Sequence, residues 1–304
     1  MRIVFMGTPD FAVPSLKQLI QDGHEIAGVY TQPDKPKNRG MKLTPPPVKV
    51  VAQAHNLPVF QPKTLRDEDV QRELAELAPE LVVVAAYGKL LPKAVLELPA
   101  LGCINVHSSL LPKYRGAAPI NWAILNGEQE TGVTIMHMAE ALDAGDIILQ
   151  AATPIDQNES VEQLHDRLAE MGAELLSKAV TALAEGTAPR IPQDESQYTY
   201  APMLSRELSP IDWSRSALEI HNQIRGLVPW PATTMELKGA KFKVFASLLT
   251  GETVEQPGGT VLGADKKGIR MVCGDGGVLC ITEVQAPGKK RMKAVDYLRG
   301  HPIL

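Results

Sequence analysis

The first 190 residues of the chain alternate between short apolar runs and segments with helical spacing. Residues 2–6 are apolar, residues 11–20 carry apolar side chains at helical intervals, and residues 25–31 are apolar again, which predicts a β-α-β opening. Residues 81–86 (Leu-Val-Val-Val-Ala-Ala) form an uninterrupted apolar run, typical of a strand covered on both faces. Since residues 66–77 predict a further helix, we expect an α/β fold with a mostly parallel, Rossmann-like sheet and helices on each side.

From about residue 160 onward the pattern changes. A long polar helix is predicted near residues 160–185, and residues 186–210 are rich in Pro, Gln, Ser and Thr, which predicts a linker. Apolar residues at helical spacing over 214–227 predict one more helix. Short apolar runs broken by Gly and Pro follow, at residues 233–236, 242–249, 260–262, 269–272 and 278–284. Several short strands of this kind predict a second, smaller OB-like β-barrel domain.

Charge is divided unequally between the two parts. We expect a first domain over residues 1–189, a linker over 190–209 and a second domain over 210–304. Residues 1–205 carry 17 Lys and Arg against 25 Asp and Glu, whereas residues 206–304 carry 14 against 10. A basic module attached to an acidic one suggests that the second domain meets a polyanion.

Missing patterns exclude several classes of protein. Cys103, Cys273 and Cys280 are an odd number without a C-x-x-C pair, so we expect buried thiols, no disulfide framework and no metal. Neither G-x-G-x-x-G nor G-x-x-x-x-G-K-[ST] occurs, and a sheet without them does not indicate a dehydrogenase. No apolar stretch reaches the roughly 18 residues that a spanning helix needs, and the chain begins as a strand rather than as a signal peptide. We therefore expect a cytoplasmic protein, with a monomer as the default.

The chemistry concentrates in the run N-V-H-S-S-L-L-P-K-Y-R-G, which starts at Asn105, and in the later L-D-A-G-D at residues 142–146. Asn105 and His107 are two apart on a predicted strand, so their side chains share a face. A neutral His can take a proton, an Asn amide can donate to an oxygen that gains negative charge, and Asp143 can hold the imidazole. A strand end with satisfied polar groups is the alternative explanation of Asn-x-His alone.

Both motifs resemble those of the 10-formyltetrahydrofolate-dependent formyltransferases. The stretch G-V-T-I-M-H-M at residues 132–138 also fits, and the resemblance runs from M-G-T-P-D-F-A at the start to a second domain of the expected size. It implies that Asn105, His107 and Asp143 are the catalytic residues. It also implies 10-formyltetrahydrofolate as co-substrate and initiator methionyl-tRNA as acceptor, for use in translation initiation.

The resemblance further implies binding residues. The folate site is expected near residues 139–143 and two other stretches, Tyr87, Gly88, Lys89, Leu90, Leu91 and Ser109, Leu110, Leu111, Pro112. The segment 32–49 has five prolines and five cations against one acid, which makes it too Pro-rich for a helix and too basic for core. A mobile surface loop is the alternative explanation. The resemblance implies a basic loop that reaches the acceptor end of the tRNA. The residues expected to contact tRNA are Lys35, Lys37, Arg39 and Lys42 in this loop, and Lys289, Lys290 and Arg291 in the second domain.

Other functions fit parts of the sequence. Related enzymes formylate a glycinamide nucleotide or an amino sugar. The former would normally stop after the first domain, whereas the latter keeps two domains. A folate hydrolase that releases the formyl group to water is a third enzymatic option. A non-catalytic RNA-binding protein is the alternative from another class, and the complete Asn, His and Asp set argues against it.

Overall fold

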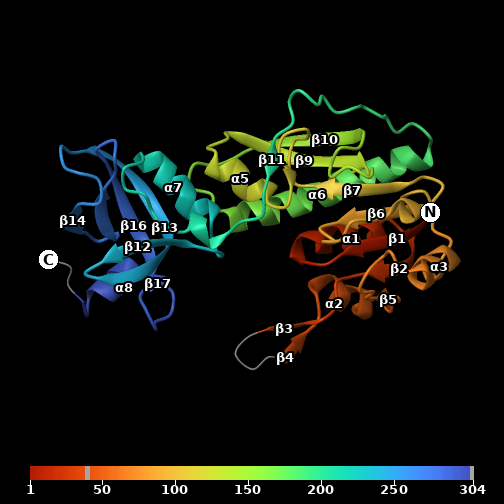
Figure 1. The fold of residues 1–304 in the computed structure, drawn as a ribbon, viewed down its shortest axis with the longest axis horizontal. Coiled ribbons are helices and arrows are strands. Elements are labelled where there is room, and N and C mark those ends of the chain that lie inside the picture. The colour runs from red at the N-terminus through yellow and green to blue at the C-terminus, as the bar shows by residue number, and fades with distance from the viewer. Residues whose placement is uncertain (38–41, 302–304) are drawn as a thin grey trace. The chain divides into compact units, whose positions relative to one another are not determined.

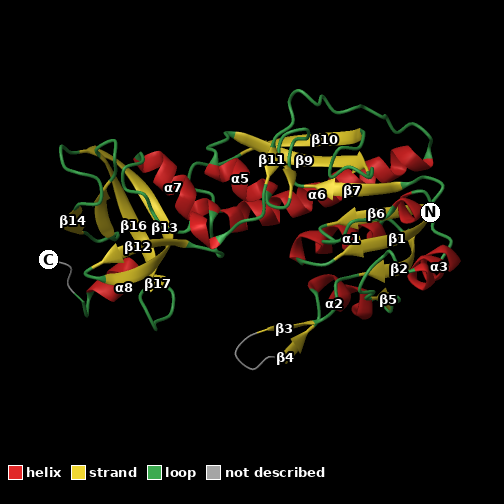
Figure 2. Ribbon diagram, viewed as in Figure 1, coloured by secondary structure: helices red, strands yellow, loops and turns green. Residues whose placement is uncertain are grey.

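The computed structural model describes residues 1–37 and 42–301 and divides into two compact units, which are treated separately below. One unit contains Met1–Gly116, Thr131–Thr153 and His165–Tyr200, and the other contains Ala117–Glu130, Pro154–Leu164 and Ala201–Leu304. The domain boundaries expected from the sequence stay a prediction. In chain order (Figures 1 and 2) the elements are β1 (Arg2–Gly7), η1 (Asp10–Ala12), α1 (Val13–Gln21), β2 (Glu25–Tyr30), β3 (Lys35–Lys37), β4 (Lys42–Thr44), α2 (Pro47–Ala54), β5 (Val59–Phe60), α3 (Glu68–Glu76), β6 (Leu81–Ala85), α4 (Lys93–Leu96), β7 (Cys103–His107), β8 (Arg115–Gly116), α5 (Pro119–Leu125), β9 (Glu130–His137), β10 (Ile147–Pro154), α6 (Val161–Ala184), β11 (Tyr200–Ala201), η2 (Arg206–Leu208), α7 (Ala217–Gly226), β12 (Thr233–Leu237), β13 (Ala240–Thr253), β14 (Val261–Ala264), β15 (Ile269–Val272), β16 (Gly277–Gln285), β17 (Met292–Lys293) and α8 (Ala294–Leu298).

The first unit is built on a seven-stranded sheet in the order β10-β9-β7-β6-β1-β2-β5 (Figure 2). Neighbours from β7 to β5 run parallel, so the prediction of a mostly parallel sheet is confirmed. β9 runs antiparallel to β7, and His107 at the end of β7 therefore lies opposite Thr134. The carboxyl ends of β6 and β7 meet at one edge, where polar side chains of a site can gather.

Helices cover both faces of this sheet. On one face Val82 and Val84 of β6 pack with Leu74 of α3 and Val95 of α4. On the other face α6 comes so close that a Cβ added to Gly172 would lie 2.9 Å from a methyl group of Val106. Since both faces are covered, the uninterrupted apolar run of β6 is explained.

One local prediction was wrong. Residues 32–49 were expected to contain no helix, yet α2 begins at Pro47, with Pro46 as its N-cap. A proline at the first position of a helix loses no hydrogen bond, because that N–H has no partner within the helix. The rest of the segment forms the short antiparallel pair β3–β4, whose paired residues include Lys35 and Thr44.

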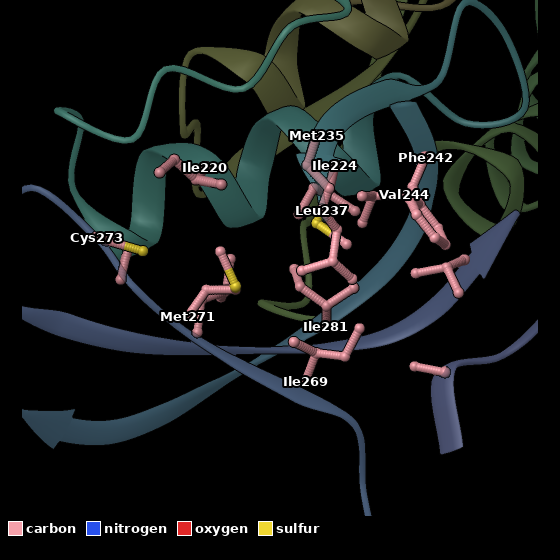
Figure 3. Packing of buried hydrophobic residues seen from close by; sticks show 14 of the residues in the cluster. Ile220, Ile224, Met235, Leu237, Phe242, Val244, Ile269, Met271, Cys273 and Ile281 are labelled. Carbon is pink, nitrogen blue, oxygen red and sulfur yellow. The ribbon is translucent and has the colours of Figure 1, made fainter. Parts of the chain in front are cut away.

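The second unit contains an antiparallel sheet in the order β12-β13-β16-β15-β14, with β17 on β16, in agreement with the OB-like prediction. Its core joins Ile220 and Ile224 of α7 to Met235, Phe242 and Ile281 of the sheet (Figure 3). α7 starts with a capping box in which Ser216 and Glu219 each accept the other's backbone N–H. Hydrogen bonds that the carboxylate accepts from the backbone N–H and the hydroxyl of Ser216 lower the pKa of Glu219 to about 2.

Buried polar side chains of α7 fasten the segment 154–164 to the same unit. The guanidinium of Arg225 donates to the carbonyls of Asp156 and Glu159 at 3.1 and 2.9 Å. His221 hydrogen-bonds the Gln157 carbonyl at 3.0 Å and the Ser247 hydroxyl at 2.9 Å. The segment therefore depends on side chains more than 50 residues away in the sequence.

We predict that Arg225→Met lowers the free energy of unfolding by about 2 kcal/mol, because the carbonyls of Asp156 and Glu159 lose a charged donor. Urea unfolding followed by circular dichroism measures the change. Arg206→Met is the matched control, since Arg206 is exposed and its side chain makes no bond among residues 1–37 and 42–301. Equal stability of the two variants would contradict the assignment.

The cysteines are buried, as expected from the sequence. Burial raises the pKa of the thiols of Cys103 and Cys273 to about 12 and that of Cys280 to about 11. At pH 8 only about one thiol in 10,000 with a pKa of 12 is ionised, and the thiolate is the reactive form. We predict that Ellman's reagent at pH 8 finds no fast-reacting thiol in the native protein and three in urea. A fast reaction of one thiol of the native protein with the reagent would disprove this prediction.

Candidate active site

Strand β7 supplies the first two side chains of the site. Asn105 lies between Val84 of β6 and Met136 of β9 in the sheet. His107, two residues on, therefore points to the same side of the strand. His107 is buried, whereas Asn105 is half-buried. The sheet thus fixes both residues at the edge where β6 and β7 end.

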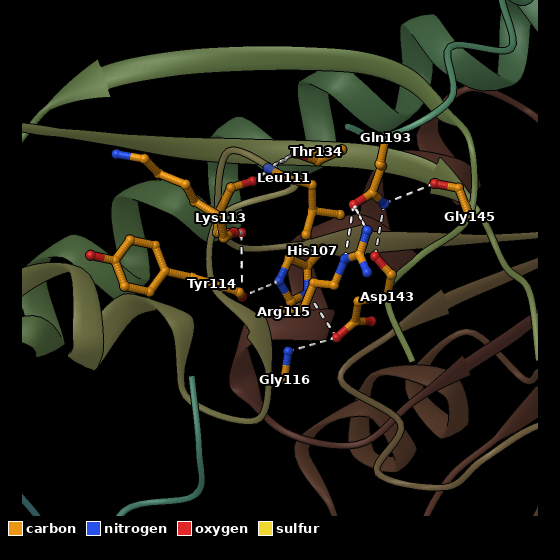
Figure 4. Close-up of polar contacts among 11 residues, drawn as sticks. His107, Leu111, Lys113, Tyr114, Arg115, Gly116, Thr134, Asp143, Gly145 and Gln193 are labelled. Carbon is orange, nitrogen blue, oxygen red and sulfur yellow. Dashed lines mark hydrogen bonds and ion pairs between the residues drawn. The ribbon is translucent and has the colours of Figure 1, made fainter. Parts of the chain in front are cut away.

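The imidazole of His107 is oriented by the loop that follows (Figure 4). Its Nε2 lies 2.9 Å from the carbonyl oxygen of Tyr114. Because a carbonyl only accepts, Nε2 must carry the hydrogen. Ser109, which is fully buried, donates its hydroxyl to the Lys113 carbonyl at 2.6 Å and so holds the loop in shape. The neutral ring therefore keeps an unprotonated Nδ1.

Asp143 faces that nitrogen. Its Oδ2 lies 3.8 Å from Nδ1 of His107 and accepts the Gly116 backbone N–H at 2.8 Å. A separation of 3.8 Å is too long for a hydrogen bond, so the carboxylate acts on the ring through charge. The sequence suggested that Asp143 holds or charge-balances the imidazole; the hydrogen bond that orients the ring comes from the carbonyl of Tyr114.

Asp143 reaches this position through a loop that crosses back over the sheet. Because β9 is antiparallel, its carboxyl end lies next to Ile104 rather than His107. Met138 donates its backbone N–H to the Cys103 carbonyl at 2.8 Å, and residues 139–143 then return to the imidazole. Asp143 has a φ of +50°, a conformation that side-chain-bearing residues rarely adopt.

The side-chain amide of Asn105 differs from the polar groups around it. Within residues 1–37 and 42–301 its side chain makes no hydrogen bond. A half-buried amide without a partner can donate to an oxygen of a bound molecule. The sequence alternative of a strand end with satisfied polar groups does not fit this side chain.

The stretch Tyr87 to Leu91, expected at the folate site, follows β6. Thr8 and Gln32 donate to the Tyr87 carbonyl at 3.2 and 3.1 Å, and Gln32 also donates to that of Gly88 at 3.2 Å. The ring of Tyr87 is buried in the core, and burial raises the pKa of its phenol to about 12. Lys89 donates to the carbonyls of Pro62 and Lys63. Leu91 is buried, whereas Leu90 is 68% exposed. The backbone here is thus held firmly at the edge of the site.

The stretch Ser109 to Pro112 is held from β9 and β10. Thr134 donates its hydroxyl to the Ser109 carbonyl at 2.7 Å and accepts the backbone N–H of Leu111 at 3.1 Å. Gln150 donates to the Leu111 carbonyl at 2.8 Å. The side chain of Leu111 is buried with Met136 and Ile147, so it packs as core. Leu110 lies close to Gly132, at which an added Cβ would be 2.6 Å from its Cδ2.

The residues expected to contact tRNA are described only in part. Lys35 and Lys37 form β3, Lys42 begins β4, and Arg39 lies outside the described residues. The base of this hairpin is braced, since Lys49 donates to Asp34 and to Gln61 at 2.9 Å. Hydrogen bonds from Gln61 and then from Lys49 lower the pKa of the Asp34 carboxyl.

The cations expected in the second unit differ in how free they are. Lys289 and Lys290 are exposed. Arg291 donates from Nη2 to Glu283 at 2.6 Å and lies 4.7 Å from the ring centre of Phe245. Its charge is therefore already paired, whereas the two lysines present theirs to solvent.

Several residues of the site were missed from the sequence. Tyr114 and Gly116 lie inside the quoted run. They contact His107 and Asp143 through backbone atoms, and the residue type does not reveal such contacts. Thr134 carried no signal within an apolar strand. Gln193 donates to the carbonyls of Asp143 and Gly145, both at 2.8 Å, although its segment was taken as a linker.

Two kinds of feature are absent from the described part of the chain. No cluster of three or more His, Cys, Asp or Glu residues is suited to hold a metal ion there. No helix in residues 1–37 and 42–301 is long and apolar enough to cross a membrane.

Comparison with known proteins shows the family of the chain. The family model for formyl transferases matches residues 1–180, and the model for the formyl transferase C-terminal domain matches residues 203–302. The methionyl-tRNA formyltransferase of Moorella thermoacetica is 51% identical over 304 residues, covering 100% of this chain and 97% of its own. That of Alkaliphilus oremlandii (strain OhILAs) is 50% identical over 303 residues, with the same coverage. An N-formyltransferase from Helicobacter canadensis, solved with folinic acid and dTDP-3-aminofucose, shares the fold with a TM-score of 0.71 at 21% identity, over 93% of this chain and 98% of that one. The chain belongs to the formyl transferase family.

Proposed function

We propose that the protein transfers the formyl group of 10-formyltetrahydrofolate to the α-amine of methionine esterified to initiator tRNA, giving N-formylmethionyl-tRNA for translation initiation. The observation that carries this proposal is the likeness to methionyl-tRNA formyltransferases, which are about half identical over the whole chain. The likeness to an amino-sugar enzyme is far lower, at 21% identity, although that enzyme also spans nearly the whole chain.

The reaction needs one bond to form and one to break. An α-amine has a pKa of about 8, so an uncharged fraction is present near neutral pH and attacks the formyl carbon. In the tetrahedral intermediate the oxygen gains negative charge and the attacking nitrogen gains positive charge. When the bond to N10 of the folate breaks, one proton has moved from the amine to N10. No covalent bond to the protein is required.

The free amide of Asn105 is suited to the oxygen. It has no partner among the described residues, so donating to the intermediate replaces no bond within the protein. A fixed donor at such an oxygen typically supplies about 3 kcal/mol of transition-state stabilisation.

His107 is suited to the proton. Since Nε2 donates to Tyr114, only Nδ1 of the neutral ring is open to take a proton from the amine and pass it to N10. The resulting imidazolium is stabilised by the carboxylate of Asp143 at 3.8 Å. His107 is therefore assigned the transfer of the proton, and Asn105 the stabilisation of the oxyanion.

The stretches Tyr87–Leu91 and Ser109–Pro112 border the folate in this proposal. The basic β3–β4 hairpin, Lys289 and Lys290 contact the tRNA phosphates. Arg291, with its charge paired, contributes less. A cytoplasmic location is part of the proposal, because charged tRNA and reduced folate are both dissolved in the cytoplasm. The proposal also takes the protein to be a monomer. Size-exclusion chromatography with light scattering tests the monomer.

The proposal is tested by an acceptor panel. The protein is incubated with 10-formyltetrahydrofolate and, in parallel, with initiator methionyl-tRNA, a dTDP-amino sugar, or water alone. Formyl transfer to methionyl-tRNA alone is expected. Binding of tRNA without transfer would favour a non-catalytic RNA-binding protein, and transfer to the sugar would favour the amino-sugar alternative.

We predict that Asn105→Ala and His107→Ala each lower kcat/KM for formyl transfer by about 100-fold or more, because each removes one group that acts in the transition state. The affinity for tRNA stays within about twofold, measured by filter binding. Asn158→Ala and His55→Ala are matched controls, since both residues are exposed. Full rates in the two site variants would refute the assignment.

We predict that Arg39→Ala causes a large loss of kcat/KM with methionyl-tRNA, of about tenfold or more, and little change in the dissociation constant of tetrahydrofolate, because a phosphate contact supplies affinity for the nucleic acid alone. The exposed Arg66 gives the control variant Arg66→Ala. Equal losses for both ligands would move this loop from tRNA recognition to the folate site.

A further inference from the structure

Gln193 links the loop of Asp143 to a buried arginine (Figure 4). Its Nε2 donates to the carbonyls of Asp143 and Gly145, each at 2.8 Å. Its Oε1 accepts from Nε and Nη2 of Arg115 at 3.0 and 2.8 Å. Arg115 is only 7% exposed. All four bonds of this one amide are thus directed at the surroundings of Asp143.

The chemistry of the neighbours fits an amide side chain here. A guanidinium only donates and backbone carbonyls only accept, so the side chain between them must accept at one end and donate at the other. An amide does both, and the neighbours also fix which end is oxygen. A carboxylate at this position would serve Arg115 but leave both carbonyls without a donor.

The Asp143 loop needs such an anchor. Asp143 has a left-handed φ of +50°, a conformation that is unfavourable for most L-residues. An added Cβ at Gly145 would lie 1.8 Å from the His137 carbonyl, so one side of the loop is pressed against β9. Gln193 holds the loop by the carbonyls of these same two residues.

Arg115 connects this anchor to the other catalytic contacts. It stands between Tyr114, whose carbonyl accepts from His107, and Gly116, whose N–H donates to Asp143. Arg115 is itself held by Glu195 at 2.7 Å, and its guanidinium lies 5.0 Å from the ring centre of Tyr198. Three consecutive residues, 114–116, therefore hold the imidazole, the Asp143 carboxylate and, through Gln193, the Asp143 backbone.

We propose that Gln193 is a positioning residue for formyl transfer, which sets the distance between the Asp143 carboxylate and Nδ1 of His107. This inference rests on the proposed function. Gln193 touches neither reacting group; it acts through the Asp143 backbone and through Arg115. A purely structural role, in which Gln193 only keeps Arg115 buried, is the competing explanation.

Two substitutions separate these roles. Gln193→Glu keeps the acceptor for Arg115 and loses the donor to the carbonyls, whereas Gln193→Leu loses both. Gln197→Leu is the matched control, four residues away on the same segment, since the exposed Gln197 side chain makes no hydrogen bond within the described residues. Steady-state kinetics are measured where circular dichroism shows each variant folded, and if Gln193→Leu fails to fold, Gln193→Glu decides.

We expect both Gln193 variants to lose about tenfold or more in kcat, with the KM for methionyl-tRNA and for the folate within about twofold, because misplacing a reacting group by about 1 Å can cost a hundredfold in rate. In an Asp143→Ala background the Gln193 substitutions should have no further effect. Unchanged kcat in Gln193→Glu, or losses that multiply with Asp143→Ala, would overturn the inference and leave the proposed function standing.

A spectroscopic measurement separates failure of the proposed function from failure of the inference on Gln193. Gln193→Leu should shift the imidazole 15N signals of His107 in the free protein, whereas Gln197→Leu should not. If the wild-type protein transfers nothing to methionyl-tRNA, the proposed function fails, but this measurement still decides whether Gln193 sets the contact between His107 and Asp143. Unshifted signals would disprove the inference that Gln193 sets this contact, whatever the activity of the protein.

Discussion

The site depends on a carboxylate and an imidazole that are held close without bonding each other. At 3.8 Å between Asp143 and Nδ1 of His107 the attraction of the carboxylate for the protonated ring is set by distance, because no hydrogen bond joins the two groups. The surroundings must therefore fix both groups independently. Tyr114, in a turn, does so for the ring, and Gly116, two residues later in β8, does so for the carboxylate. A shift of this short segment moves both partners together and preserves their separation.

The two halves of the site have different origins in the fold. Asn105 and His107 take their places from the pleat of β7, a strand paired on both sides, and a covered sheet deforms little. Asp143 comes from a loop that crosses back over the sheet and strains its backbone. A loop has no ladder of its own, so its position must be imposed by outside contacts. That explains why backbone carbonyls of the loop, and not only the side chain of Asp143, are hydrogen-bonded.

Periodicity predicted the α/β sheet, the long helix α6 and the strands of the second unit, because these depend on which faces are buried. The prediction of Asn105, His107 and Asp143 as catalytic residues followed from local motifs and their resemblance to a family. The antiparallel course of β9 was not readable, since an apolar strand has the same pattern in either direction. The start of α2 at Pro47 was missed because proline was treated only as a helix breaker. Backbone partners such as Tyr114 and Gly116 have no residue-type signal at all.

Gln193 shows how a segment that looks like a connection can belong to the chemistry. Thr199 accepts the Arg115 N–H at its carbonyl and the Tyr114 N–H at its hydroxyl, and the side chains of Gln193 and Glu195 accept from Arg115. Three residues of the segment 193–199 therefore bond to the residues that orient the site. Polar, Pro-bearing composition reflects exposure, and most of this segment is exposed. A segment that is mostly exposed can still have a few side chains that point inward and hold a site, as Gln193 does here. Asp143 is therefore constrained by a segment outside the seven-stranded sheet. The backbone of this segment can follow the Asp143 loop, because it is not paired with the strands of that sheet.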